Sequence, residues 1–230
     1  DLAALPSPYL CGMFDALLEQ PYAFQASQET HRGCPYACTF CDWGAATMSK
    51  VRRFEHARLA AEFDWMGTKG IELLYNCDAN YGLFKEDIAL TEMLVAAKRK
   101  HGAPSKFRAA YAKNSNERVY EIAKTLNAEG MCKGVTLSFQ SMDKKVLEIV
   151  KRKNMAANDF KALITMYRRA AIPTYTELIL GLPGETYDTF ADGIETLLEA
   201  GQHDSLNVYH AMLLPNSEMN APAYKEIHGI

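Results

Sequence analysis

The sequence lacks the features that mark a secreted, membrane-spanning or nucleic-acid-binding protein. Its longest apolar runs, such as Ile71–Tyr75, have the length of a strand and are too short to cross a bilayer. No signal peptide is recognisable, and a net charge of −3 leaves no excess of positive charge for a nucleic-acid surface. The cysteines form no disulfide-like framework, which is typical of a reducing compartment. We therefore expect a cytoplasmic protein with no membrane contact and no nucleic-acid partner.

Signs of a domain boundary are also missing. No internal repeat, low-complexity tract or domain-breaking linker interrupts the 230 residues. The first residue is Asp1 rather than Met, which predicts that the chain is a piece of a longer protein. We interpret residues 1–22 as a linker or extension, residues 23–217 as one domain, and residues 218–230 as the start of a C-terminal segment.

Strand-like and helix-like segments alternate along the chain, a pattern typical of a parallel sheet wrapped by helices. Six such units cannot close an eight-stranded barrel, so the predicted fold class is α/β, a partial (β/α)6 barrel of the TIM type with helices outside. The predicted strands are residues 22–30, 70–76, 106–111, 134–139, 173–180 and 205–213. The predicted helices are residues 54–66, 85–101, 117–129, 144–151, 158–170 and 187–200.

Three of the six cysteines lie within eight residues, at Cys34, Cys38 and Cys41. Thiolates are the soft ligands that hold iron–sulfur clusters, and an ordinary cubane takes four of them. Three thiolates leave one iron open to a small molecule with an amine and a carboxylate. The spacing therefore predicts a [4Fe–4S] cluster that acts on a bound molecule.

A zinc-stabilised binding module is the alternative from a different class. Zinc sites use four ligands, usually in two pairs, and Cys11, Cys77 and Cys132 each stand alone. His31 lies three residues before Cys34 and could supply a fourth ligand. Iron and sulfide analysis with an absorbance spectrum separates the two interpretations, because zinc sites are colourless.

With Phe40 just before its last cysteine, the C-x3-C-x2-C motif resembles the signature of the radical S-adenosylmethionine (SAM) superfamily. The resemblance implies that Cys34, Cys38 and Cys41 ligate the cluster. It implies reductive cleavage of SAM to methionine and a 5′-deoxyadenosyl radical, which abstracts a hydrogen from an unactivated carbon. Cluster and SAM would carry this chemistry, so no protein side chain is assigned as catalytic. An electron donor such as flavodoxin or ferredoxin is implied as a partner.

The same resemblance implies which residues contact SAM. After the second predicted strand, Asp78 and Asn80 would accept from the methionyl ammonium. After the fourth, Ser138 and Gln140 would bind the ribose, and a following helix would bring Arg152 to the carboxylate, which its planar fork suits. A plain Asx-rich turn and a solvated helix end remain the alternatives for the first and last of these.

Strand 173–180 with its Gly-Leu-Pro-Gly turn resembles the segment that runs past the adenine in the superfamily. Leu180 and Gly181 would provide a flat apolar wall and close backbone approach. Tyr209 on the sixth strand would extend that wall, and Phe40 is assigned to the same cofactor site.

Two further segments, 5–10 and Cys41-Asp42-Trp43-Gly44, resemble radical SAM enzymes that carry an N-terminal cobalamin-binding domain. They favour cobalamin-assisted methyl transfer, with cobalamin bound by a domain outside this chain. A tRNA-modifying radical SAM enzyme is the second enzyme hypothesis, although the sequence shows neither a basic face nor an added nucleic-acid domain. No residue identifies the substrate, so a small molecule and a substrate of unknown class both stay open.

Overall fold

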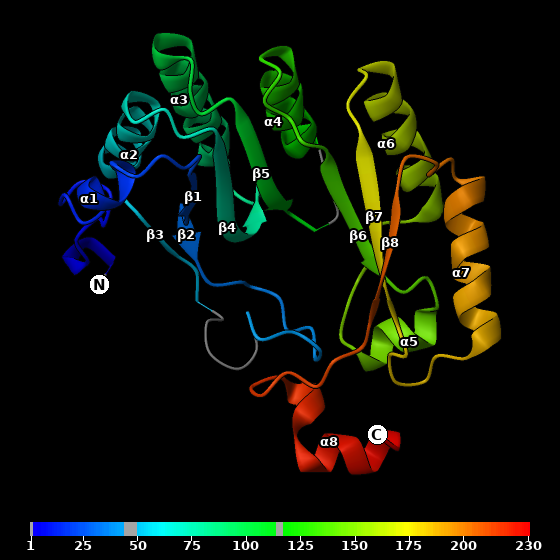
Figure 1. The fold of residues 1–230 in the computed structure, drawn as a ribbon. Coiled ribbons are helices and arrows are strands. Elements are labelled where there is room, and N and C mark those ends of the chain that lie inside the picture. Colours follow the sequence, from blue (N-terminus) through cyan, green and yellow to red (C-terminus); the bar gives the residue numbers. More distant parts are fainter. Residues whose placement is uncertain (1, 44–49, 114–116) are drawn as a thin grey trace. The chain divides into compact units, whose positions relative to one another are not determined.

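The computed structural model describes residues 2–43, 50–113 and 117–230 (Figure 1). The chain divides into two compact units. Asp1–Arg32 and Arg52–Gly134 form the first unit, and Gly33–Val51 and Val135–Ile230 form the second.

The first unit is built on a three-stranded parallel sheet in the order β1-β4-β5. Helix α2 packs beside α3, and its residues Leu59, Phe63 and Met66 are buried at the spacing of one helical face. The sheet strands are β1 (Gln25–Gln28), β4 (Leu73–Tyr81) and β5 (Lys106–Tyr111), with an antiparallel pair β2 (His31–Arg32) and β3 (Arg52–Arg53). The helices are η1 (Leu2–Ala4), α1 (Asp15–Leu18), α2 (His56–Thr68), α3 (Glu86–His101) and α4 (Glu117–Ala128).

The second unit has its own three-stranded parallel sheet in the order β6-β7-β8, with α6 and α7 alongside it in Figure 1. Helix α7 begins with a capping box in which Thr186 and Thr189 satisfy each other's backbone N–H groups. The strands are β6 (Val135–Gln140), β7 (Thr174–Leu180) and β8 (Leu206–His210). The helices are α5 (Lys144–Ile149), α6 (Ala157–Arg169), α7 (Tyr187–Glu199), η2 (Glu218–Asn220) and α8 (Pro222–His228).

The predicted fold class is confirmed. All six predicted strands are present, they are parallel within their sheets, and helices separate them along the chain. The described residues form no closed barrel, in agreement with a partial one. No helix in the described ranges is both long and apolar enough to span a membrane.

The predicted end of the second strand was wrong. The predicted strand ended at residue 76, but β4 continues to Tyr81 and the chain turns only at Gly82. Asn76, Asp78 and Asn80 alternate along this stretch and are all buried, each with 1% exposure or less. Asx-rich segments usually mark turns because their side chains bond the local backbone. Here the Asp78 carboxylate accepts from the Thr30 and His31 N–H groups, which are distant in the chain, and the strand continues.

Candidate functional site

The three cysteines lie on one short loop of the second unit. Cys34 and Cys38 are buried and Cys41 is half-buried. The Cys41 N–H donates to the Cys38 carbonyl over 3.1 Å, which closes the loop on itself. The Trp43 N–H donates to the Cys41 sulfur over 3.4 Å. The loop thus presents its thiols from a folded turn, while Gly44 of the predicted motif lies outside the described residues.

The thiols of the loop can be compared with the ligand sets of a zinc ion and of an iron–sulfur cluster. Within the described ranges, no three His, Cys, Asp or Glu side chains are close enough to hold one metal ion. A zinc site gathers four ligands around one ion, with Zn–S distances of about 2.3 Å. The thiolates of a cubane bind different irons and stay apart. Three thiol side chains on one loop are the donors that a [4Fe–4S] cluster takes, so the donor set fits such a cluster.

Arg152 follows α5 and is only 4% exposed. Its Nε donates to the Phe139 carbonyl (3.1 Å) and to Asn154 Oδ1 (3.0 Å), and its Nη2 donates to the Ser138 carbonyl. These bonds fix the guanidinium plane at the end of β6. Its Nη1 is buried without a hydrogen-bond partner among the described residues. The alternative of a solvated helix end is therefore wrong for this residue.

The buried guanidinium is also electrostatically coupled to the cysteine loop. Burial lowers the pKa of Arg152, and the Cys38 and Cys41 thiols act in the opposite direction. Burial raises the pKa of Tyr36, and the Cys34 and Cys38 thiols raise it further. A cation, a phenol and the thiols therefore share one region, and a buried unpaired N–H favours an anionic ligand there.

The sheet register brings a second group of polar side chains together. Ser138, Glu177 and Asn207 are paired across β6, β7 and β8, so they share one face of the sheet. The Ser138 hydroxyl donates to Glu177 Oε2 over 2.5 Å. Sequence reasoning missed Glu177, although a carboxylate inside the apolar strand Thr174–Leu180 was a usable signal.

The predicted adenine contacts do not all share that face. Tyr209 is paired with Ile179, two residues from Glu177, and is half exposed. Leu180 is 38% exposed and is paired with His210, so it points to the opposite face. Phe40 packs against the apolar cluster of the second unit.

The turn after β7 is tied back to the end of β6 by one carboxylate. Glu185 accepts from the Gly181 N–H (2.8 Å) and from the Ser141 hydroxyl (3.2 Å). Burial raises the pKa of Glu185, although both hydrogen bonds lower it. The predicted Gln140 lies beside this link, with the left-handed φ of 70°. Glu185 therefore shapes the two strand ends that carry the predicted cofactor residues.

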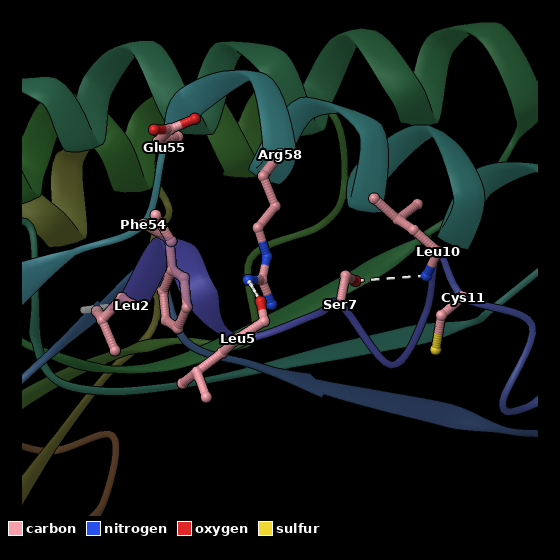
Figure 2. Close-up of a pocket in the computed structure, with 9 residues that line it drawn as sticks. Leu2, Leu5, Ser7, Leu10, Cys11, Phe54, Glu55 and Arg58 are labelled. Carbon is pink, nitrogen blue, oxygen red and sulfur yellow. Dashed lines mark hydrogen bonds between the residues drawn. The ribbon is translucent and has the colours of Figure 1, made fainter.

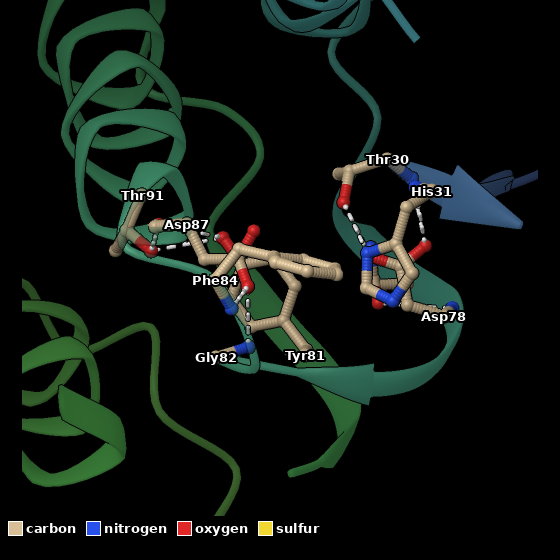
Figure 3. Close-up of polar contacts among 9 residues, drawn as sticks. Thr30, His31, Asp78, Tyr81, Gly82, Phe84, Asp87 and Thr91 are labelled. Carbon is tan, nitrogen blue, oxygen red and sulfur yellow. Dashed lines mark hydrogen bonds and ion pairs between the residues drawn. The ribbon is translucent and has the colours of Figure 1, made fainter. Parts of the chain in front are cut away.

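In the first unit, the buried side chain of Asp78 links β4 to Thr30 and His31 (Figure 3). Its Oδ1 accepts from the Thr30 and His31 N–H groups, at 2.7 and 3.1 Å. Its Oδ2 accepts from the Thr30 hydroxyl and from Asn76 Nδ2 (3.1 Å). Asp78 is 1% exposed and Asn80 is fully buried. The Asp78 carboxylate is thus occupied by donors of the protein itself.

A pocket of about 340 Å³ lies elsewhere in the first unit, between the N-terminal residues and α2 (Figure 2). Arg58 lines it, but its guanidinium is already bound by the Leu5 carbonyl (2.6 Å) and by Glu62 (2.9 Å). None of the predicted site residues lines this pocket. We assign it no catalytic role.

Comparisons with known proteins identify a superfamily model and several proteins that resemble this chain. A sequence model of the Radical SAM superfamily matches residues 29–197. The chain is 46% identical over 229 residues to the cobalamin-dependent radical SAM methyltransferase TokK of Streptomyces tokunonensis, covering 98% of this chain and 34% of that protein. It is also 46% identical over 221 residues to the 2-(S-pantetheinyl)-carbapenam-3-carboxylate methyltransferase of Streptantibioticus cattleyicolor, covering 94% and 32%.

Among solved structures, the radical SAM methyltransferase TsrM of Kitasatospora setae, with tryptophan and a SAM analogue bound, has a TM-score of 0.73. It is 20% identical, and the match covers 90% of this chain and 39% of that one, which shows a shared fold. The chain spans about a third of the length of the curated relatives it matches. The cysteine loop, Arg152 and β7 lie inside the matched residues 29–197, whereas η2 and α8 lie outside them.

Proposed function

The chain belongs to the radical SAM superfamily, and from this premise we propose that it is the catalytic domain of a cobalamin-dependent methyltransferase. The observation that carries the proposal is the cysteine loop with buried Arg152 beside it, in a chain 46% identical to a cobalamin-dependent methyltransferase over nearly its whole length. The methyl acceptor is an unactivated carbon of a small molecule.

Cys34, Cys38 and Cys41 hold the [4Fe–4S] cluster. When bound, the cluster supplies the electron for reductive SAM cleavage. The protein orients SAM and excludes water, while the cofactors supply the reactivity. Burial of Cys34 and Cys38 supports this role, because it limits solvent access to the cluster.

Arg152 binds the methionyl carboxylate of SAM through Nη1, the nitrogen that the protein leaves without a partner. Ser138 and Gln140 bind the ribose hydroxyls, and Glu177 joins them because a carboxylate can accept from a ribose hydroxyl. Tyr209 and Gly181 remain predicted adenine contacts, and Leu180, whose side chain points to the opposite face of the sheet from Tyr209, would contact the adenine through its main chain. Phe40 remains a predicted residue of the same cofactor site. Together with Ser138, Gln140 and Glu177, these are the residues that we assign to the nucleoside part of SAM.

The predicted contacts at Asp78 and Asn80 stay a prediction for the methionyl ammonium. Because the Asp78 carboxylate is saturated by protein donors, we assign the contact to backbone carbonyls at the end of β4. The side chain of Asp78 then acts by fixing that strand end. Substitutions at Asp78 should affect SAM binding through stability.

A carbapenam carboxylate is the first substrate class to test, because the relative from Streptantibioticus cattleyicolor is named for one. The electron donor is a small redox protein such as flavodoxin or ferredoxin. We place the enzyme in the cytoplasm, where such donors and a reducing environment are available.

The test uses the longer protein that contains this chain, reconstituted anaerobically with iron, sulfide and cobalamin. We expect a methylated carbapenam, formed only when SAM, a reductant and cobalamin are all present. Ser138→Ala and Glu177→Gln should raise the KM for SAM while iron content is unchanged. Full turnover without cobalamin would overturn the methyltransferase proposal and leave the superfamily membership intact.

A further inference from the structure

Thr39 sits between the two cysteines at the end of the loop, and every polar atom it has is bonded within the protein. Its N–H donates to the Val150 carbonyl over 3.1 Å, at the end of α5. Its carbonyl accepts from the Met219 N–H over 2.8 Å, in η2. Its hydroxyl lies 3.1 Å from the hydroxyl of Tyr224, in α8. Thr39 is fully buried, so the loop is clamped from two sides.

Only one assignment of donor and acceptor is consistent with the contacts of the Thr39 and Tyr224 hydroxyls. The Tyr224 hydroxyl donates to the Ile149 carbonyl over 3.1 Å. A tyrosine has a single hydroxyl proton, so its oxygen must accept from the Thr39 hydroxyl. The chain of bonds therefore runs from Thr39 through Tyr224 to the last residue of α5. It engages the Thr39 hydroxyl proton, which is then not available to another acceptor.

Apolar packing holds Tyr224 in this place. Tyr224 and Met219 belong to one buried cluster with Val146, Val150 and Leu182, and Phe40 of the cysteine loop packs against that cluster. An ion pair between Lys151 and Glu218, with 2.6 Å between Nζ and Oε1, links α5 to η2 at the surface. The contact is thus supported by several elements, although η2 and α8 lie outside the residues matched by the superfamily model.

We propose that Tyr224 is a positioning residue for the [4Fe–4S] cluster, which it controls through Thr39. It fixes the main chain between Cys38 and Cys41, and it keeps the Thr39 hydroxyl from donating to a cluster sulfur. Hydrogen bonds to the sulfurs are one of the factors that set a cluster's reduction potential, and each stabilises the more negative, reduced form. By keeping the Thr39 hydroxyl bonded to Tyr224, these contacts therefore keep the reduction potential of the cluster low. This inference rests on the proposed function, because it requires that the three cysteines hold the cluster.

Tyr224→Phe removes the hydroxyl and keeps the ring in its packing. Freed of its acceptor, the Thr39 hydroxyl can turn to the cluster, so the midpoint potential should become more positive. Thr39→Val fills the same volume without a hydroxyl, so it should leave the potential unchanged. The double variant should behave as Thr39→Val does. Potentials are measured by anaerobic redox titration, followed by electron paramagnetic resonance, on the reconstituted longer protein without SAM.

A second readout tests the clamp independently of the potential. Both single variants break the same hydrogen-bond chain, so each should release iron to a chelator about fivefold faster, the factor that corresponds to about 1 kcal/mol for one hydrogen bond. Because the two residues act as a unit, the double variant should release iron no faster than either single variant. Thr39→Val keeps this test available even where Tyr224→Phe does not fold.

The matched control is Tyr187→Phe, which removes the hydroxyl of a tyrosine that is 86% exposed at the start of α7. It should match the wild type in potential and iron release. Wild-type values for Tyr224→Phe in both measurements would overturn the inference and reduce Tyr224 to a packing residue. Absence of a four-iron cluster in the wild-type protein would instead refute the proposed function.

Discussion

At the scale of single residues, we expect Cys34, Cys38 and Cys41 to be cluster ligands and the other cysteines not to be. Cys38→Ala should abolish the cluster, because a cubane held by two thiolates loses most of its protein binding. Iron and sulfide content and the absorbance spectrum after anaerobic reconstitution measure this. Cys11→Ser and Cys132→Ser are the controls and should retain full iron, since Cys11 is exposed and Cys132 is a half-buried thiol whose pKa burial raises. Four irons in Cys38→Ala would contradict the ligand assignment.

The carboxylate of Asp78 should matter more for folding than for ligand contact. Asp78→Ala leaves the buried Thr30 and His31 N–H groups without an acceptor, which we expect to lower the free energy of unfolding by about 3 kcal/mol. Denaturant unfolding measures the loss. Asp192→Ala, on the exposed side of α7, should change stability by about 0.5 kcal/mol or less. Equal stability of the two variants would show that the Asp78 network contributes little.

At the scale of elements, the turn between β7 and α7 should respond to pH through Glu185. Burial raises the pKa of this carboxyl above its ordinary 4.5, so the folded state binds the proton more tightly than the unfolded state. Its contribution to stability is complete below pH 4.5 and is lost as the pH rises through the folded pKa. Between these values, the free energy of unfolding should fall more steeply with pH in the wild type than in Glu185→Gln.

Urea unfolding at several pH values from 4.5 to neutrality measures both slopes. Glu195→Gln, at an exposed position of α7, is the matched control and should keep the wild-type slope. A slope for Glu185→Gln that equals the wild type would show that the half-buried carboxyl of Glu185 does not couple the turn to pH.

The spacing of apolar residues in the sequence predicted the helices that bury one face. Leu59, Phe63 and Met66 repeat at helical spacing, and α2 is where the sequence places it. The continuation of β4 could not be predicted, because Asp78 is satisfied by Thr30, which lies 48 residues away in the chain. Helix α8 was missed for a similar reason. It has seven residues, and its anchor Tyr224 bonds Thr39, which is 185 positions distant.

The candidate site shows the same division. The assignments of the three cysteines and of Arg152 stay predictions, and they could be made because short motifs with fixed spacing carry their chemistry. Glu177 was missed because its meaning depends on register, which pairs it with Ser138 across two strands. Leu180 was grouped with Tyr209, although strand alternation turns the two side chains to opposite faces. Local motifs can thus be read from the sequence, whereas pairings between strands require the fold.

At the scale of the whole molecule, the 230 residues should hold the cluster and yet not complete methyl transfer. They span about a third of their cobalamin-dependent relative, and we propose that cobalamin is bound by a domain outside them. The reconstituted chain should bind four irons and form 5′-deoxyadenosine slowly from SAM. It should form no methylated product, with or without added cobalamin. Mass spectrometry of both products checks this, and methyl transfer by these residues alone would contradict it.

The contacts of η2 and α8 with the cysteine loop determine at which residues segments of this domain can be exchanged with those of its relatives. A chimaera with its crossover at residue 197, where the superfamily match ends, would join one parent's Thr39 to another parent's residues at positions 219 and 224. The cysteine loop and the helices η2 and α8 that contact it would then come from different parent proteins. Residues 33–43 and 217–229 should be exchanged as a single cassette, although 173 residues separate the two parts in the chain.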